Sequence, residues 1–196
     1  MVLTTAYFPP VEYFAILAKY SLVYIEACEN YQKQSYRNRC HFYADNGPQA
    51  LNVPVVHENG TFSLPITQIR VDYSTPWVVR SERAIEAAYG SSPFFEYYRD
   101  ELFSILDARP ERLWDLNLGI MDFFRRKIGL ATSIVPTSEF RRNVDEDMRY
   151  ILHPKKASDY VAKPYYQVFS SRHGFIPNLS VMDLLFNEGP ESICYL

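Results

Sequence analysis

One stretch of the chain, residues 31–39, combines side chains that could hold a phosphorylated or sugar-like ligand. It carries one ammonium, two guanidinium groups, three amides, a hydroxyl and two phenols, and no acid. Cationic groups bind phosphate oxygens, amides bind hydroxyl groups, and flat rings stack. The residues predicted to bind the ligand here are Lys33, Tyr36, Arg37, Asn38 and Arg39. The alternative is a solvated loop or a polar edge strand, because polar runs usually lie at the surface.

Several other chemistries lack the residue patterns that they require. The sequence contains no H-x-x-x-H, Walker-type or G-x-S-x-G pattern, so it gives no support for metal-dependent hydrolysis, P-loop chemistry or an α/β-hydrolase. Cys28, Cys40 and Cys194 form no C-x-x-C pair, which argues against a disulfide framework or a zinc site. We therefore predict no metal site, and the residues do not identify a cofactor.

The overall charge and the distribution of apolar residues exclude further classes. Twenty basic and twenty-three acidic residues give a net charge of −3, so there is no bulk electrostatic basis for binding nucleic acid. No stretch approaches the roughly 20 apolar residues that span a bilayer. The N-terminus has no basic region before an apolar run, as a signal peptide would have. We expect a cytoplasmic protein with no transmembrane segment.

The first thirty residues predict a strand, a helix and a second strand. Residues 2–7 are short, apolar and β-branched, and prolines at 9 and 10 suit a helix start. Apolar residues then recur at helical spacing through residue 20, and residues 22–25 resemble a buried strand. Such a βαβ unit is parallel, and ligands gather beyond the carboxyl ends of parallel strands. The donor-rich stretch 31–39 follows the second strand directly.

The rest of the chain predicts a mixed sheet, a helical middle and a short last helix. A strand at 40–43 and another at 49–56 join across a strong turn signal, a turn is expected at Asn59-Gly60, and 66–71 and 132–135 are further strands. Helices are expected from Ser81, after Ser92-Pro93 and from Pro110. Ser180 and Asp183 form a capping-box pattern before the last helix. We predict one α/β domain over residues 1–196.

Four stretches of this sequence resemble the WbqC-like family, whose members are associated with bacterial O-antigen and surface-polysaccharide gene clusters. They are residues 7–14, 33–39, 77–98 and 166–189, in the order found in the family. The sequence departs from the family at residues 5–7, where many members have a His-Gln-Pro type motif. The resemblance implies transfer or modification of a group on a sugar precursor, and it leaves the reaction open.

Two candidate catalytic residues and two more ligand-binding residues follow from these stretches. His173 lies within the most specific stretch, and a pKa near neutrality suits proton transfer. Gln167 and Asn178 are near it in sequence, and Tyr7 is the last of the three residues that stand in place of the family's His-Gln-Pro type motif.

Two functions of different classes therefore stay open. The first is a transferase whose cationic residues hold an activated, nucleotide- or lipid-diphosphate-linked sugar and whose tyrosines stack on a ring or donate a hydroxyl. The second is a non-catalytic binding or assembly protein that uses a tyrosine-rich face against another protein of the same pathway.

Overall fold

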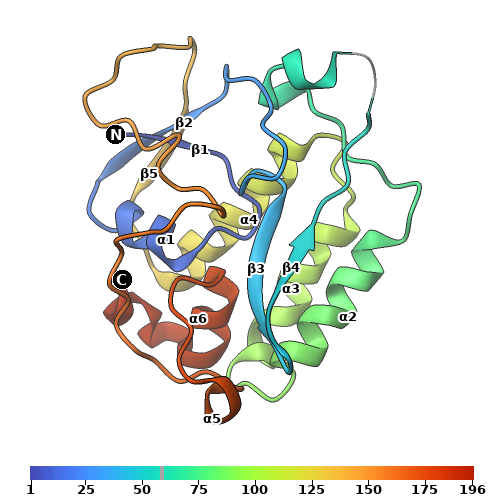
Figure 1. The fold of residues 1–196 in the computed structure, drawn as a ribbon, viewed down its shortest axis with the longest axis vertical. Helices are drawn as coiled ribbons and strands as arrows, with labels where there is room; N and C mark the ends of the chain where they lie inside the picture. The colour runs from blue at the N-terminus through green and yellow to red at the C-terminus, as the bar shows by residue number, and fades with distance from the viewer. Residues whose placement is uncertain (58–59) are drawn as a thin grey trace.

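The computed structural model describes residues 1–57 and 60–196 and confirms the predicted βαβ unit. Strand β1 (Val2–Thr4), helix α1 (Val11–Leu17) and strand β2 (Leu22–Glu26) follow in order. The two strands are parallel, with Val2 opposite Tyr24. Strand β5 (Ser133–Pro136) pairs in parallel with the other side of β2, giving the strand order β1-β2-β5. Figure 1 shows this sheet with α1 beside it.

An antiparallel hairpin forms a second, separate sheet. It consists of β3 (Arg39–Ala44) and β4 (Gly47–Asn52). Parallel and antiparallel pairings are therefore both present, as predicted for this α/β fold, but in two sheets. The prediction of a strand at 66–71 is wrong, and the segment begins as a 3₁₀ turn, Ile66–Gln68. The backbone amides of Ile66 and Val71 donate to the loop carbonyls of Glu29 and Glu111 and not to a neighbouring strand. Asn59, in the predicted turn, lies outside the described residues.

Three helices make up the middle of the chain, after a short 3₁₀ turn at Thr61–Ser63. They are α2 (Trp77–Tyr89), α3 (Phe95–Asp107) and α4 (Leu113–Ile128). The predicted cap at Ser81 is wrong, because α2 begins directly after Pro76 and Ser81 is a buried residue inside the helix. At the end of α4, Gly129 adopts a φ of +82°, a left-handed conformation that glycine takes without steric cost.

The C-terminal part contains α5 (Ser170–His173), α6 (Val181–Glu188) and a 3₁₀ segment (Gly189–Tyr195). Ser180 caps α6 as predicted, since its hydroxyl accepts a hydrogen bond from the Met182 amide at 3.3 Å. Asp183 does not complete the capping box. The amide of Ser180 already donates to the carbonyl of His41, and the Asp183 carboxylate turns into the core.

A long segment without helix or strand, residues 137–169, connects β5 to α5. We call it the strap. Its Asp147 pairs with Val2 at the free edge of β1, so the strap continues the parallel sheet for one residue. Figure 1 shows the strap passing from the sheet across α1 toward α6. Irregular segments of this length in compact proteins are usually functional. In the described residues, no helix is long and apolar enough to cross a membrane.

Candidate functional site

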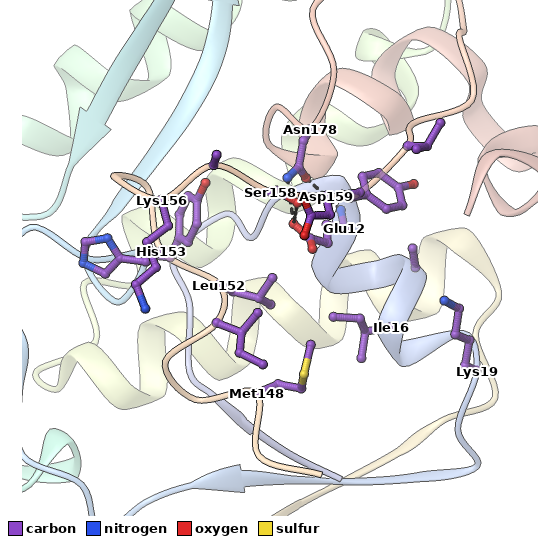
Figure 2. A pocket seen from close by; sticks show the side chains of 16 residues that line it. Glu12, Ile16, Lys19, Met148, Leu152, His153, Lys156, Ser158, Asp159 and Asn178 are labelled. Carbon is purple, nitrogen blue, oxygen red and sulfur yellow. Dashed lines mark hydrogen bonds between the residues drawn. The ribbon is translucent and has the colours of Figure 1, made fainter.

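A cavity of about 450 Å³ lies between α1 and the strap. Figure 2 shows that one side of it is apolar, where Ile16, Met148 and Leu152 lie together. The opposite side is polar and is formed by the first turn of α1, by the strap and by Asn178. A cavity of this size, with an apolar surface and a few convergent polar groups, is typical of small-molecule sites.

The carboxylate of Glu12 is the centre of the polar side. Its Oε2 accepts hydrogen bonds from the Ser158 hydroxyl at 2.7 Å and from the Asn178 side-chain amide at 2.8 Å. Asn178 also accepts a bond from the Glu12 backbone amide at 3.0 Å. These contacts join three parts of the chain that are far apart in sequence. The strap is thereby fastened to α1 at the mouth of the cavity (Figure 2).

Two tyrosines line the same cavity, Tyr36 and Tyr160. Burial raises the pKa of Tyr36 to about 12, and the negative charge of Glu12 adds to that effect. The pKa of Tyr160 is raised by the same two causes, with burial again the larger. Both phenols therefore stay protonated at neutral pH and can donate hydrogen bonds to a ligand.

A basic group lies on the strap side of the cavity, where His153 and Lys156 line it. Burial lowers the pKa of His153, and the charges of Lys156 and Lys155 lower it further. Its Nδ1 accepts a hydrogen bond from the Lys155 amide at 3.1 Å, so the neutral ring carries its proton on Nε2. His153 can thus act as a hydrogen-bond donor. Lys19, in the turn after α1, supplies a further cation at the other end (Figure 2).

The strap is held in place by a buried arginine. Arg149 is 1% exposed and donates from Nη1 to Oε2 of Glu26 at 2.7 Å and from Nε to Asp147 at 2.9 Å. Glu26, also 1% exposed, is the last residue of β2. Because a buried charge without its partner is costly, this contact ties the strap firmly to the carboxyl end of the sheet. The wall of the cavity begins next to this anchor.

The predicted donor-rich stretch lies beside the loop after β1, as the βαβ unit implied, since the Tyr7 amide donates to the Tyr36 carbonyl at 2.8 Å. Its cations, however, do not line the cavity. Arg37 is 1% exposed and forms a bidentate ion pair with Glu29. Its Nε donates to Oε1 of Glu29 at 2.9 Å, and its Nη2 contacts Oε2. Its role in binding a ligand stays a prediction, but in this structure the guanidinium serves to neutralise Glu29.

Three more predicted residues of that stretch, Lys33, Asn38 and Arg39, also lie outside the cavity. The side-chain amide of Asn38 donates to the Val53 carbonyl at 3.1 Å, and Arg39 donates to the side chain of Asn52 at 2.7 Å across the hairpin. Lys33 is exposed and does not line the cavity. Only Tyr36 of the five side chains lines it.

Tyr7, Gln167 and His173 are not brought together either. The Tyr7 ring is fully buried, and burial raises its pKa well above the ordinary range. Gln167 is buried and donates to the Asp183 carboxylate at 2.7 Å. His173 is exposed on α5, where its Nε2 lies 2.8 Å from the Asp45 carbonyl. Their proposed roles remain predictions, whereas Asn178 joins Tyr36 in the cavity.

The residues that the sequence did not single out are Glu12, His153, Lys156 and Ser158. Glu12 was inside the first family-like stretch and could have been selected as its only acid. The strap residues gave one local signal, a histidine followed closely by two lysines in a polar segment. Among residues 1–57 and 60–196, no group of three or more potential metal ligands is close enough to hold an ion.

The fold and the cavity define an α/β protein with a small-molecule-sized site between its first helix and an irregular strap. The sequence matches the model of the WbqC-like protein family over residues 5–164, and the chain belongs to that family. The match ends before the fourth family-like stretch, 166–189. The chain is also similar to an uncharacterized protein, Rv1507c, of Mycobacterium tuberculosis (strain ATCC 25618 / H37Rv), with 25% identity over 218 residues, covering 97% of this chain and 94% of that protein. No solved structure matches the chain.

Proposed function

We propose that this protein is a cytoplasmic transferase of bacterial surface-polysaccharide biosynthesis that binds an activated sugar in the cavity between α1 and the strap. The observation that carries the proposal is the meeting of three separate family-like stretches there. Glu12, Tyr36 and Asn178 come from the first, second and fourth stretch, and all three line the cavity. The family resemblance supports the pathway, and the lining supports the ligand.

The chemistry of the lining fits a sugar joined to phosphate. Phenol hydroxyls and an amide side chain can bond sugar hydroxyls, while the apolar side can receive the face of a sugar ring. The cations Lys19 and Lys156 can hold phosphate oxygens at either end (Figure 2). His153 and the two phenols can donate hydrogen bonds to a reacting oxygen.

The test is a thermal-shift panel of nucleotide sugars, sugar phosphates, free nucleotides and simple sugars. A ligand at about 100 times its Kd adds roughly 2.7 kcal/mol, which raises the Tm by about 5–10 °C for a chain of this length. Lys156→Gln should remove most of that shift, and Arg83→Gln, a change on the exposed side of α2, should leave it intact. A panel without any shift would refute the proposal, and so would an unaltered shift in Lys156→Gln.

A second candidate function is a non-catalytic binding or assembly protein of the same pathway. One face of the parallel sheet favours it, because Leu22, Tyr24 and Val135 on that face are each about 40% exposed. Parallel sheets are ordinarily covered on both faces. This second function predicts no shift with any small molecule in the panel.

A further inference from the structure

The inference concerns the substrate class of the cavity and rests on the proposed function. Apart from Lys19 at the far end, the charged side chains of the cavity form one acidic and one basic group. Figure 2 shows Glu12 and Asp159 close together on the polar side, next to Asn178, with His153 and Lys156 grouped at one end. A ligand that matches both groups needs a positive part at one end and a negative part at the other.

The acidic part has the features of a site for an ammonium group. Of the two oxygens of Glu12, Oε2 accepts both hydrogen bonds, and Oε1 accepts none from the described residues. Two aromatic side chains, Tyr36 and Tyr160, line the cavity, and the charge of Glu12 contributes to raising the pKa of both phenols. Carboxylates combined with aromatic rings recognise ammonium groups, since both attract a cation.

The basic part suits a phosphate. The side chain of Lys156 donates to the Tyr150 carbonyl at 2.8 Å, which fixes its stem along the strap and leaves two ammonium protons for a ligand. His153 adds a donor at Nε2, because its Nδ1 is engaged by the Lys155 amide. The apolar surface of Ile16 and Leu152 lies across the cavity from the polar side, where a sugar ring could rest.

From this arrangement we propose that the substrate is a sugar phosphate with a free amino group, its ammonium held by Glu12 and Asp159 and its phosphate by His153 and Lys156. An N-acetylated sugar is excluded as the preferred ligand. It lacks the positive charge and would leave the Glu12 carboxylate covered without a compensating cation. A sugar with a hydroxyl in place of the amine also lacks the positive charge that would compensate Glu12. It should bind less weakly than the N-acetylated sugar, because its hydroxyl can still donate one hydrogen bond to the carboxylate.

The experiment compares three probes by isothermal titration at pH 7: glucosamine 1-phosphate, N-acetylglucosamine 1-phosphate and glucose 1-phosphate. We expect the amine to bind wild type at least about tenfold more tightly than either other probe, the effect of one charge-assisted hydrogen bond. Glu12→Gln keeps an oxygen for Ser158 and Asn178 but removes the charge. It should abolish the preference for the amine.

One control variant and the pattern of binding separate the possible failures. Asp115→Asn removes an exposed acid on α4, outside the cavity, and should leave all three affinities unchanged. Equal binding of the three probes, or a preference for the amine that persists in Glu12→Gln, would overturn the inference and leave the proposed function standing. Failure of all three to bind wild type, combined with no shift in the panel, would overturn both.

Discussion

Replacing Arg37 by alanine should destabilise the protein strongly, because the change would strand a buried carboxylate. The side chains of Arg37 and Glu29 are 2% and 1% exposed, and the pair is joined by two contacts. Removing one partner of such a pair costs about 3–5 kcal/mol. For a chain of about 200 residues, each kcal/mol lowers the Tm by about 2–4 °C, so the expected fall is roughly 6–20 °C.

The assay is urea unfolding followed by circular dichroism, with a partner variant and a control. Arg37→Met combined with Glu29→Leu removes both charges and should recover most of the lost stability, since apolar replacements of buried pairs are often neutral. Arg39→Ala removes only a surface contact to Asn52 and should cost less than about 1 kcal/mol. If Arg37→Ala unfolded within 1 kcal/mol of wild type, the guanidinium would not be neutralising Glu29 and the reasoning would fail.

Two further predictions concern Asp183 and the strap. Burial raises the pKa of the Asp183 carboxyl from 3.8 to about 6, so the folded state binds the proton more tightly than the unfolded state does. The free energy of unfolding is therefore highest below about pH 4, and it falls by roughly 3 kcal/mol as the pH rises to 6. Asp183→Asn should abolish that fall in urea unfolding between pH 4 and 7, and an unchanged slope would contradict it. Ser158→Ala removes the hydrogen bond to Glu12, so trypsin should cut after Lys156 about tenfold faster, as opening costs about 1.5 kcal/mol less. Ser104→Ala, which removes a bond only within α3, is the control, and equal cleavage rates would show that Ser158 does not fasten the strap.

Local signals in the sequence were enough to predict the framework. Prolines before α1, α3 and α4, glycine after α4 and the apolar periodicity of the helices act over a few residues, so neighbours in sequence determine them. The cap at Ser180 is also a local signal, since its hydroxyl accepts a hydrogen bond from the amide of Met182, two residues away. The failure at 66–71 arose where long-range partners bonded the backbone, whereas the cap at Ser81 failed because α2 begins earlier, directly after Pro76.

The candidate site could not be located in the same way. A sequence shows the hydrogen-bonding capacity of a side chain but not what that capacity is used for. Arg37 and Gln167 have the groups expected of ligand-binding residues, yet their bonds are made to Glu29 and Asp183 inside the protein. Only Tyr36 and Asn178 among the predicted residues reached the cavity.

What the sequence by itself determined is therefore the order and type of most elements, the βαβ start and the family. Tertiary structure alone decided which polar residues meet. Ser158 and Glu12 are 146 positions apart, and no local pattern links them. Their contact exists because Arg149 fastens the strap to the end of β2, which brings it across α1. The cavity is thus a product of long-range packing. That packing decides which polar side chains are buried against partners inside the protein and which line the cavity.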